Sequence, residues 1–341
     1  MNSKITLSTS KMYSLFVRSR LNKCTNKRFL GNLQSESTRQ NELFDLEKKR
    51  QREEIGRIDK IEVEVQCKSE SKTYVMNKLI STPYDCARHL NETIMNKTAV
   101  ALINGETLWH MHKPLPDSCK LEFLDYKVSQ PGQVNKAFWR TCSFLLGAVA
   151  SNAFKDKVDV QLHSFPIPNV KSGSFVYDIQ LSLDNWVPTS SELRVLSMEM
   201  IKFCQQAHPI ECLDVTADFA LVLFKENPHK TMQIPDIAAN NNGKVTLFRA
   251  GPNVDISKGP MIANTNQLGR TTVTNVIKLD TDIKGSPVYR FQGVALPSSI
   301  VLNHFAYGLL EERAKNLNSA RIPGSQDVTT EDNSFMAQAT N

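Results

Sequence analysis

Two Gly-Pro pairs constrain one short segment of this chain, FRAGPNVDISKGPM (Phe248–Met261), more tightly than any other part of the sequence. The pairs are Gly251-Pro252 and Gly259-Pro260, and Asp255 lies between them. Glycine permits backbone dihedrals that other residues avoid, and proline fixes φ, so the two pairs define the shape of a loop. The segment therefore predicts a loop of fixed shape that frames a functional site. Any reactive side chains of that site must come from elsewhere in the chain.

The charge of the chain is concentrated at its beginning. Residues 1–35 contain seven of the 41 Lys and Arg residues and none of the 35 Asp and Glu residues. The same segment is rich in Ser, Thr and Asn, which is typical of a mitochondrial transit peptide. The alternative is a disordered basic arm that stays on the protein and touches nucleic acid. Without this segment the chain is close to neutral, which argues against a protein that only coats nucleic acid.

The composition excludes several classes of protein. The longest apolar run, Phe144–Phe154, is far shorter than the roughly 18 residues of a membrane-spanning helix. The seven cysteines include no CxxC pair, which argues against a disulfide framework or a zinc ribbon. Neither GxxxxGK[ST] nor a GxGxxG after a strand is present, so no common nucleotide-binding motif applies.

The first half of the sequence predicts an arm and a small domain. Residues 36–58 are dense in charge and predict a charged helical arm that docks a partner or stays solvated. From Lys60 the pattern alternates as a half-buried strand should, a helix begins near Thr82, and a strand then runs into the hairpin pair Asn104-Gly105. Residues 60–128 therefore form a β-α-β unit of the size of a β-grasp domain.

The second half predicts a larger α+β domain over residues 135–317. A buried helix is expected over 135–154, and two strands follow it. Thr189 and Glu192 form a capping box that opens another helix, and a last helix is expected over 298–317. Residues 318–341 are polar and predict a disordered tail.

Two groups of candidate metal ligands are weak. His110 and His112 would share one face of a strand, but we expect an exposed hairpin there because no third ligand is evident. Cys204, His208 and Cys212 recur every four residues, but Pro209 indicates that the helix has already ended. We therefore expect neither a metal nor a cofactor.

Two stretches resemble the editing domain of threonyl-tRNA synthetases. They are FWRTCSFLLG (Phe138–Gly147) and the Gly-Pro segment described above, and YRFQGVALP (Tyr289–Pro297) is similar to the exit from that domain. Residues 60–127 resemble the TGS domain that precedes it. The resemblance implies an α+β fold in which a TGS-like β-grasp domain is followed by an editing-like domain. No class II aminoacylation core follows in this sequence.

A transit peptide, a TGS-like unit and an editing-like domain without a synthetase body also resemble a family of mitochondrial large-subunit ribosomal proteins. The stretches that carry this resemblance are NELFDLEKKRQ, VMNKLISTPYDCARHL and PGQVNKAFWR. It implies a structural component of the mitochondrial ribosome in the matrix, whose partners are ribosomal proteins and ribosomal RNA. Neither a membrane nor a small-molecule substrate is expected.

The resemblance also implies that the catalytic groups are lost. The active family has two His four residues apart where this chain has Arg140 and Phe144, and a Cys and a His where it has Ser257 and Met261. A guanidinium cannot act as a general base at neutral pH, and Phe and Met side chains have no exchangeable proton. The loop frame is retained at five positions: Gly251, Pro252, Asp255, Gly259 and Pro260. We expect a non-catalytic protein, with a freestanding aminoacyl-tRNA deacylase or a tRNA-binding module as the alternatives.

Overall fold

The computed structural model describes residues 27–66, 71–155, 157–283 and 286–321. Helices and sheets are both abundant, and the predicted α+β class is confirmed. Most of the predicted transit peptide, residues 1–26, lies outside the described residues. Residues 27–35 belong to the first described helix, α2 (Lys27–Glu54), which continues without a break into the predicted arm.

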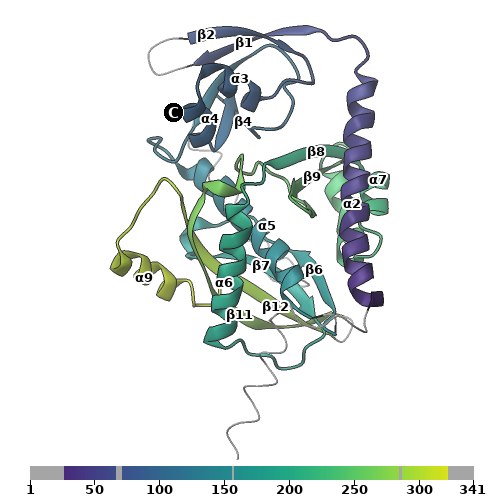
Figure 1. Cartoon of the computed structure of the whole chain (residues 1–341), viewed down its shortest axis with the longest axis vertical. Coiled ribbons are helices and arrows are strands. Elements are labelled where there is room, and N and C mark those ends of the chain that lie inside the picture. The colour runs from purple at the N-terminus through teal and green to yellow at the C-terminus, as the bar shows by residue number, and fades with distance from the viewer. Residues whose placement is uncertain (1–26, 67–70, 156, 284–285, 322–341) are drawn as a thin grey trace, which may run out of the picture.

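A five-stranded sheet, of order β2-β1-β5-β3-β4, forms the small domain at the top of Figure 1. Alternate residues of β1 are buried, as the sequence pattern predicts, and the positive φ of Asn104 and Gly105 makes the turn of the β3–β4 hairpin. Thr82 and Asp85 cap α3 reciprocally. The elements of this domain are β1 (Lys60–Gln66), β2 (Ser71–Asn77), α3 (Pro83–Leu90), α4 (Glu92–Lys97), β3 (Val100–Ile103), β4 (Thr107–Trp109) and β5 (Cys119–Leu124).

The larger domain contains two further sheets, of order β11-β12-β7-β6 and β10-β9-β8. Its helices are α5 (Gly132–Ala153), α6 (Ser190–Gln205), α7 (Ala217–Leu223), α8 (Pro228–Ala239) and α9 (His304–Arg313). Its 3-10 turns are η1 (Val170–Ser172) and η2 (Thr265–Gln267). Its strands are β6 (Val160–Ser164), β7 (Phe175–Leu181), β8 (Ile210–Thr216), β9 (Lys244–Ala250), β10 (Asn253–Ile256), β11 (Leu268–Ile283) and β12 (Ser286–Pro297).

Helix α5 is the centre of the largest hydrophobic core. Its residues from Ala137 to Ala150 are buried, apart from Arg140, and they pack against β7 and β12. Gly147 allows the closest approach, since a Cβ at this position would lie 2.4 Å from the ring of Tyr177 on β7. The same core reaches into the small domain through Val100, and Gln267 Nε2 donates to the carbonyl of Thr98 at 2.8 Å. The two domains are therefore packed against each other.

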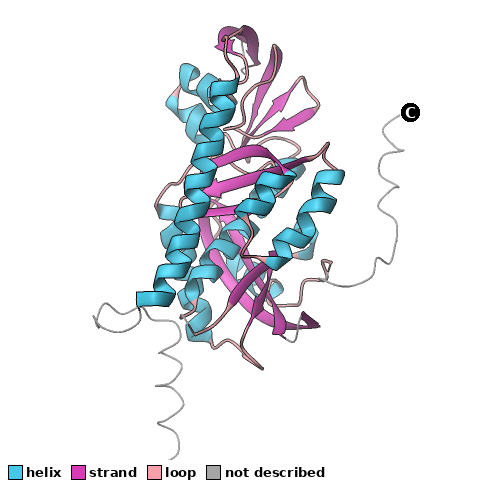
Figure 2. Cartoon of the chain, turned by 90° about the vertical axis from the view of Figure 1, so that its right-hand side faces the viewer, coloured by secondary structure: helices cyan, strands magenta, loops and turns pink. Residues whose placement is uncertain are grey.

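The charged helix α2 is packed against the larger domain, in contrast to the exposed arm that the sequence suggested. It lies along β8 and α7 in Figure 1, and in Figure 2 this side of the molecule faces the viewer, with the long helix in front of the body. Phe44 is fully buried, and the Arg249 guanidinium lies 4.3 Å from the centre of its ring. Leu43 packs against the same core, and charged side chains of the helix pair with the body, as Lys48 does with Glu211.

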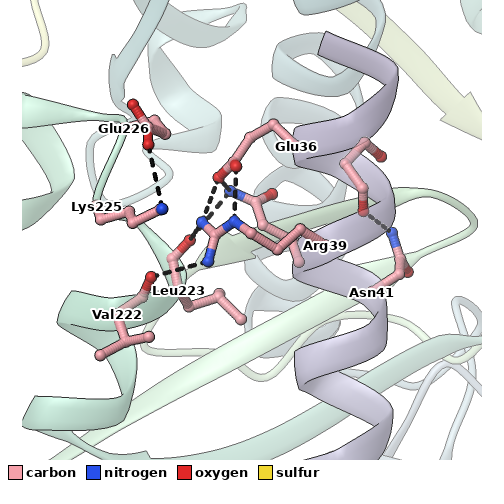
Figure 3. Close-up of polar contacts among 9 residues, drawn as sticks. Glu36, Arg39, Asn41, Val222, Leu223, Lys225 and Glu226 are labelled. Atoms are coloured by element: carbon pink, nitrogen blue, oxygen red, sulfur yellow. Dashed lines mark hydrogen bonds and ion pairs between the residues drawn. The ribbon is translucent and has the colours of Figure 1, made fainter. Parts of the chain in front are cut away.

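Backbone carbonyls of the body hold the middle of α2, and Figure 3 shows the contacts of Arg39. Arg39 donates to the carbonyls of Val222 at 3.1 Å and Leu223 at 2.8 Å, while Glu36 holds its guanidinium in place. Asn41 donates to the carbonyl of Pro252 at 2.7 Å. Hydrogen bonds from a charged donor to main-chain oxygens add to the apolar contact and fix the direction of the helix.

The C-terminal helix is shorter than predicted, and the chain after it is bound to the body. Helix α9 spans His304–Arg313 instead of residues 298–317, because Asn303 caps its first turn. Arg290 on β12 is fully buried, and its guanidinium pairs with Asp178 at 2.7 Å. It also donates to the carbonyls of residues 318, 320 and 321 at 2.7–2.8 Å. The predicted disordered tail is therefore wrong for residues 318–321, while residues 322–341 lie outside the described part.

Candidate functional site

The two segments that resemble an editing domain meet in space. Thr141 on α5 accepts a hydrogen bond from the backbone N–H of Ile262 at 3.0 Å. The preceding residue, Arg140, donates from its Nη1 to the carbonyl of Pro260 at 2.9 Å. The predicted positions therefore lie around one site between α5 and the loop that follows β10.

The four positions where the resemblance implied lost catalytic groups contain no acid–base pair. Phe144 and Met261 are buried in the hydrophobic core and fill space. Ser257 Oγ accepts from the backbone N–H of Gly259 at 3.3 Å. Among the described residues, neither a histidine nor a carboxylate hydrogen-bonds to this hydroxyl, so nothing is placed to take its proton. A hydroxyl without a base is a weak nucleophile.

The loop frame has a packing reason at its glycines. Gly251 and Gly259 have φ of 53° and 66°, in the left-handed region that favours glycine. A Cβ on Gly259 would lie 2.6 Å from the ring of Phe248. The Gly259-Pro260 peptide bond is cis. The frame therefore serves the fold, whether or not any chemistry takes place beside it.

Asp255, which the sequence suggested was part of the loop frame, is instead a buried charge on β10. Its Oδ1 lies 2.5 Å from Lys230 Nζ, and its Oδ2 accepts from the Tyr177 hydroxyl at 2.6 Å. Lys230 Nζ also donates to the same hydroxyl at 3.0 Å. All three side chains are buried. Burial and the neighbouring Asp255 carboxylate raise the pKa of Tyr177 well above its ordinary value, so the phenol stays protonated.

Sequence reasoning missed the Lys230–Tyr177–Asp255 triad. Lys230 comes from α8 and Tyr177 from β7, and neither belongs to a recognisable motif. The available signal was the position of Asp255 itself, between the apolar residues Val254 and Ile256, because a carboxylate in an apolar strand needs a partner. Since the ammonium and carboxylate neutralise each other, the triad explains the retained aspartate without any reaction.

Two histidines lie beside the triad. The rings of His163 and His229 are 4.8 Å apart, and His229 Nε2 lies 2.5 Å from Gln180 Oε1. Burial, followed by the charges of His229 and Lys230, lowers the pKa of His163 to about 4. His163 is therefore neutral at physiological pH.

His110 and His112 are not on an exposed hairpin, so that expectation was wrong. His110 is 2% exposed and packs edge-on against Phe248, while His112 Nε2 lies 3.0 Å from the carbonyl of Ala263. Both lie where the small domain meets the larger one, which is why they are buried. Burial lowers the pKa of both rings.

The remaining metal candidates are separated by the fold. Helix α6 ends at Gln205, before Pro209, as predicted, and Cys212 lies on β8. In the described part of the chain, no three His, Cys, Asp or Glu side chains gather closely enough to hold a metal ion. None of the described helices is both long and apolar enough to cross a bilayer.

Comparison with known proteins agrees with this architecture. The family model of the TGS domain matches residues 78–125. Large ribosomal subunit protein mL39 of Drosophila melanogaster is 50% identical over 299 residues, which are 88% of this chain and 90% of that protein. Threonine–tRNA ligase 2, cytoplasmic, of Homo sapiens is 25% identical over 252 residues, and the probable threonine–tRNA ligase 1, cytoplasmic, of Dictyostelium discoideum is 27% identical over 194 residues.

The matches to the ligases cover only part of those proteins. They span 73% and 57% of this chain but only 29% and 25% of the ligases. The fold and the site thus define a protein with a TGS domain and a threonyl-tRNA synthetase-like domain. More narrowly, the chain belongs to the family of large ribosomal subunit protein mL39.

Proposed function

We propose that this chain is a non-catalytic structural component of the large subunit of the mitochondrial ribosome, in the mitochondrial matrix. The observation that carries the proposal is the 50% identity to large ribosomal subunit protein mL39 across 88% of the chain. Its role is to support mitochondrial translation by filling and bracing the particle. The basic, acid-free segment at residues 1–35 supports delivery to mitochondria.

The candidate site supports a role without catalysis. Ester hydrolysis needs a group that activates water or a hydroxyl and a group that stabilises the developing charge. Phe144 and Met261 replace two such groups with buried apolar side chains, and Ser257 has no base among the described residues. What persists is a packed loop and a neutralised triad, both of which stabilise the fold.

The partners of the chain would be ribosomal proteins together with ribosomal RNA. After residue 35 the chain has 34 basic and 35 acidic residues, which supports a set of partners weighted towards protein. The outer face of α2 remains open to a partner, since Leu46 is 64% exposed there. The docking role first assigned to the arm is therefore restricted to this outer face.

Sedimentation tests the proposal. A tagged version of the chain is expressed in cells of its source organism, and mitochondrial lysate is sedimented on gradients with and without magnesium. We expect the chain to migrate with the large subunit in moderate salt. Its position should shift when the removal of magnesium loosens the particle. Migration as a free protein of about its own mass would overturn the ribosomal role.

The preserved frame favours one rival, a freestanding deacylase. The assay incubates purified protein with seryl-tRNA and measures released serine, beside a Ser257→Ala variant. We expect release at the rate of the spontaneous reaction for both proteins. Release above that rate that is lost in Ser257→Ala would establish the rival.

A further inference from the structure

Arg140 is a largely buried cation without a counter-charge. Its Nη1 donates to the carbonyl of Pro260, but no carboxylate among the described residues forms an ion pair with the guanidinium. Burial lowers the pKa of Arg140, and no acidic neighbour offsets this effect. A guanidinium has five N–H donors, and a partly desolvated one that is left unpaired costs free energy. The site therefore has capacity for an anion.

Two further lysines lie near Arg140 in the chain or along the loop that it contacts. Lys136 lies one helical turn nearer the N-terminus of α5, is exposed, and forms no ion pair with any described residue. Helix α5 contains no Asp or Glu over its 22 residues, so nothing on this helix neutralises either cation. Lys258 is exposed on the loop whose Pro260 carbonyl Arg140 contacts.

The N-terminus of α5 adds to the positive electrostatic potential of these cations. Pro131 at the N-cap provides no side-chain hydrogen bond, and the first turn contains no acidic residue. The free N–H groups and the helix dipole there favour a negative charge. Lys136 lies one turn along α5 from this end, and Arg140 lies a further turn along.

We propose that Lys136, Arg140 and Lys258 bind the phosphate backbone of an RNA segment, which makes the former editing-site entrance a phosphate contact. The guanidinium of Arg140 keeps N–H donors beyond its bond to Pro260, and these match the oxygens of a phosphate. Lys136, one helical turn away, adds a second cation, and two neighbouring cations match successive phosphates better than a single ion. The inference rests on the proposed function, because ribosomal RNA is the RNA that the chain would meet. It gives Arg140 a role where the resemblance suggested only loss.

RNA binding by the purified full-length chain gives the first test. The anisotropy of a fluorescein-labelled RNA hairpin is measured over a range of KCl concentrations for wild type, Lys136→Gln and Arg140→Gln. We expect each variant to bind more weakly, and the slope of log affinity against log salt to fall in magnitude by roughly one. Lys244→Gln is the matched control, because Lys244 is exposed at the far end of β9 and forms no ion pair with a described residue.

Lys136→Gln keeps the test decisive if Arg140→Gln does not fold, because Lys136 is exposed. If Lys136→Gln and Lys244→Gln change affinity and slope equally, the proposal fails. Adding inorganic phosphate without RNA tests whether the site binds a small anion instead of an RNA backbone. Protection against thermal unfolding by phosphate that needs Arg140, without any preference for RNA, would overturn the assignment to an RNA backbone.

Crosslinking in the particle separates this inference from the proposed function. A photo-reactive residue replaces Gln133, which is exposed in the first turn of α5. We expect a nuclease-sensitive adduct in purified large subunits. Adducts to protein alone, in a chain that does sediment with the large subunit, would overturn the RNA site and leave the structural role standing. A chain that does not sediment with the particle would overturn both.

Discussion

Replacing Lys230 with methionine tests whether the buried triad stabilises the fold. The side chains of Lys230 and Asp255 are 3% and 5% exposed and lie 2.5 Å apart. Methionine keeps most of the aliphatic packing but removes the ammonium. Asp255 then keeps only the Tyr177 hydroxyl at 2.6 Å and the backbone N–H of Ile256 at 2.7 Å.

Removal of one partner from a buried ion pair costs about 3–5 kcal/mol, because the other charge stays buried without compensation. At about 2–4 °C per kcal/mol for a domain of this size, the melting temperature should fall by at least about 6 °C. Urea unfolding followed by circular dichroism measures the free energy of unfolding directly. The control is Lys225→Met, since Lys225 pairs with Glu226 on the surface, and its loss should be within about 0.5 kcal/mol.

The double variant Lys230→Met/Asp255→Asn identifies the source of the loss. It removes both charges but keeps an acceptor for the Tyr177 hydroxyl, so it should lose less stability than the two single variants together. A coupling of about 0.5–3 kcal/mol is expected for groups in one network. Additive losses, or a loss of less than about 1 kcal/mol in Lys230→Met, would refute the argument that the pair forms a charged unit.

Three further predictions concern other parts of the fold. Because burial lowers the pKa of His163 to about 4, the wild type should lose stability as the pH falls from about 6.5 to 4, and this group should cause no further loss below pH 4. A plot of urea midpoint against pH should have a shallower slope for His163→Gln, and equal slopes would contradict the prediction. Gly147→Ala should lower the free energy of unfolding in urea by about 1–3 kcal/mol, because its Cβ would meet the Tyr177 ring at 2.4 Å, and an unchanged free energy would show that α5 can shift freely. Phe44→Ala should weaken the packing of α2 on the body by about 3–5 kcal/mol and speed tryptic cleavage within α2. Unchanged cleavage would mean that the polar contacts alone hold the helix.

Elements whose causes are local could be predicted from the sequence. The capping boxes at Thr82 and Thr189, the alternating strand β1 and the Asn104-Gly105 turn follow from residues within four positions of each other. The boundaries were less certain where a cap was overlooked, as at Asn303, which starts α9 later than the apolar pattern indicates.

Features that depend on distant partners could not be read from the pattern. Lys230 and Asp255 are 25 positions apart on different elements, and only the fold shows that they pair. The charge of α2 suggests solvation, yet Phe44 and Arg249 together dock it. The resemblance to editing domains assigned Arg140 and the Pro260 loop to one domain, but only the fold shows their contact.

The clamp formed by Arg290 has a consequence for how the chain folds during its synthesis. Arg290 on β12 already has Asp178 available when it is made, but three of its acceptors are the carbonyls of residues 318, 320 and 321. Its fully buried guanidinium can therefore be satisfied only after about thirty more residues have left the ribosome. Until then Asp178 is the one acceptor of this set within reach, so the environment of Arg290 is completed by main-chain carbonyls whose side chains it does not contact through these bonds.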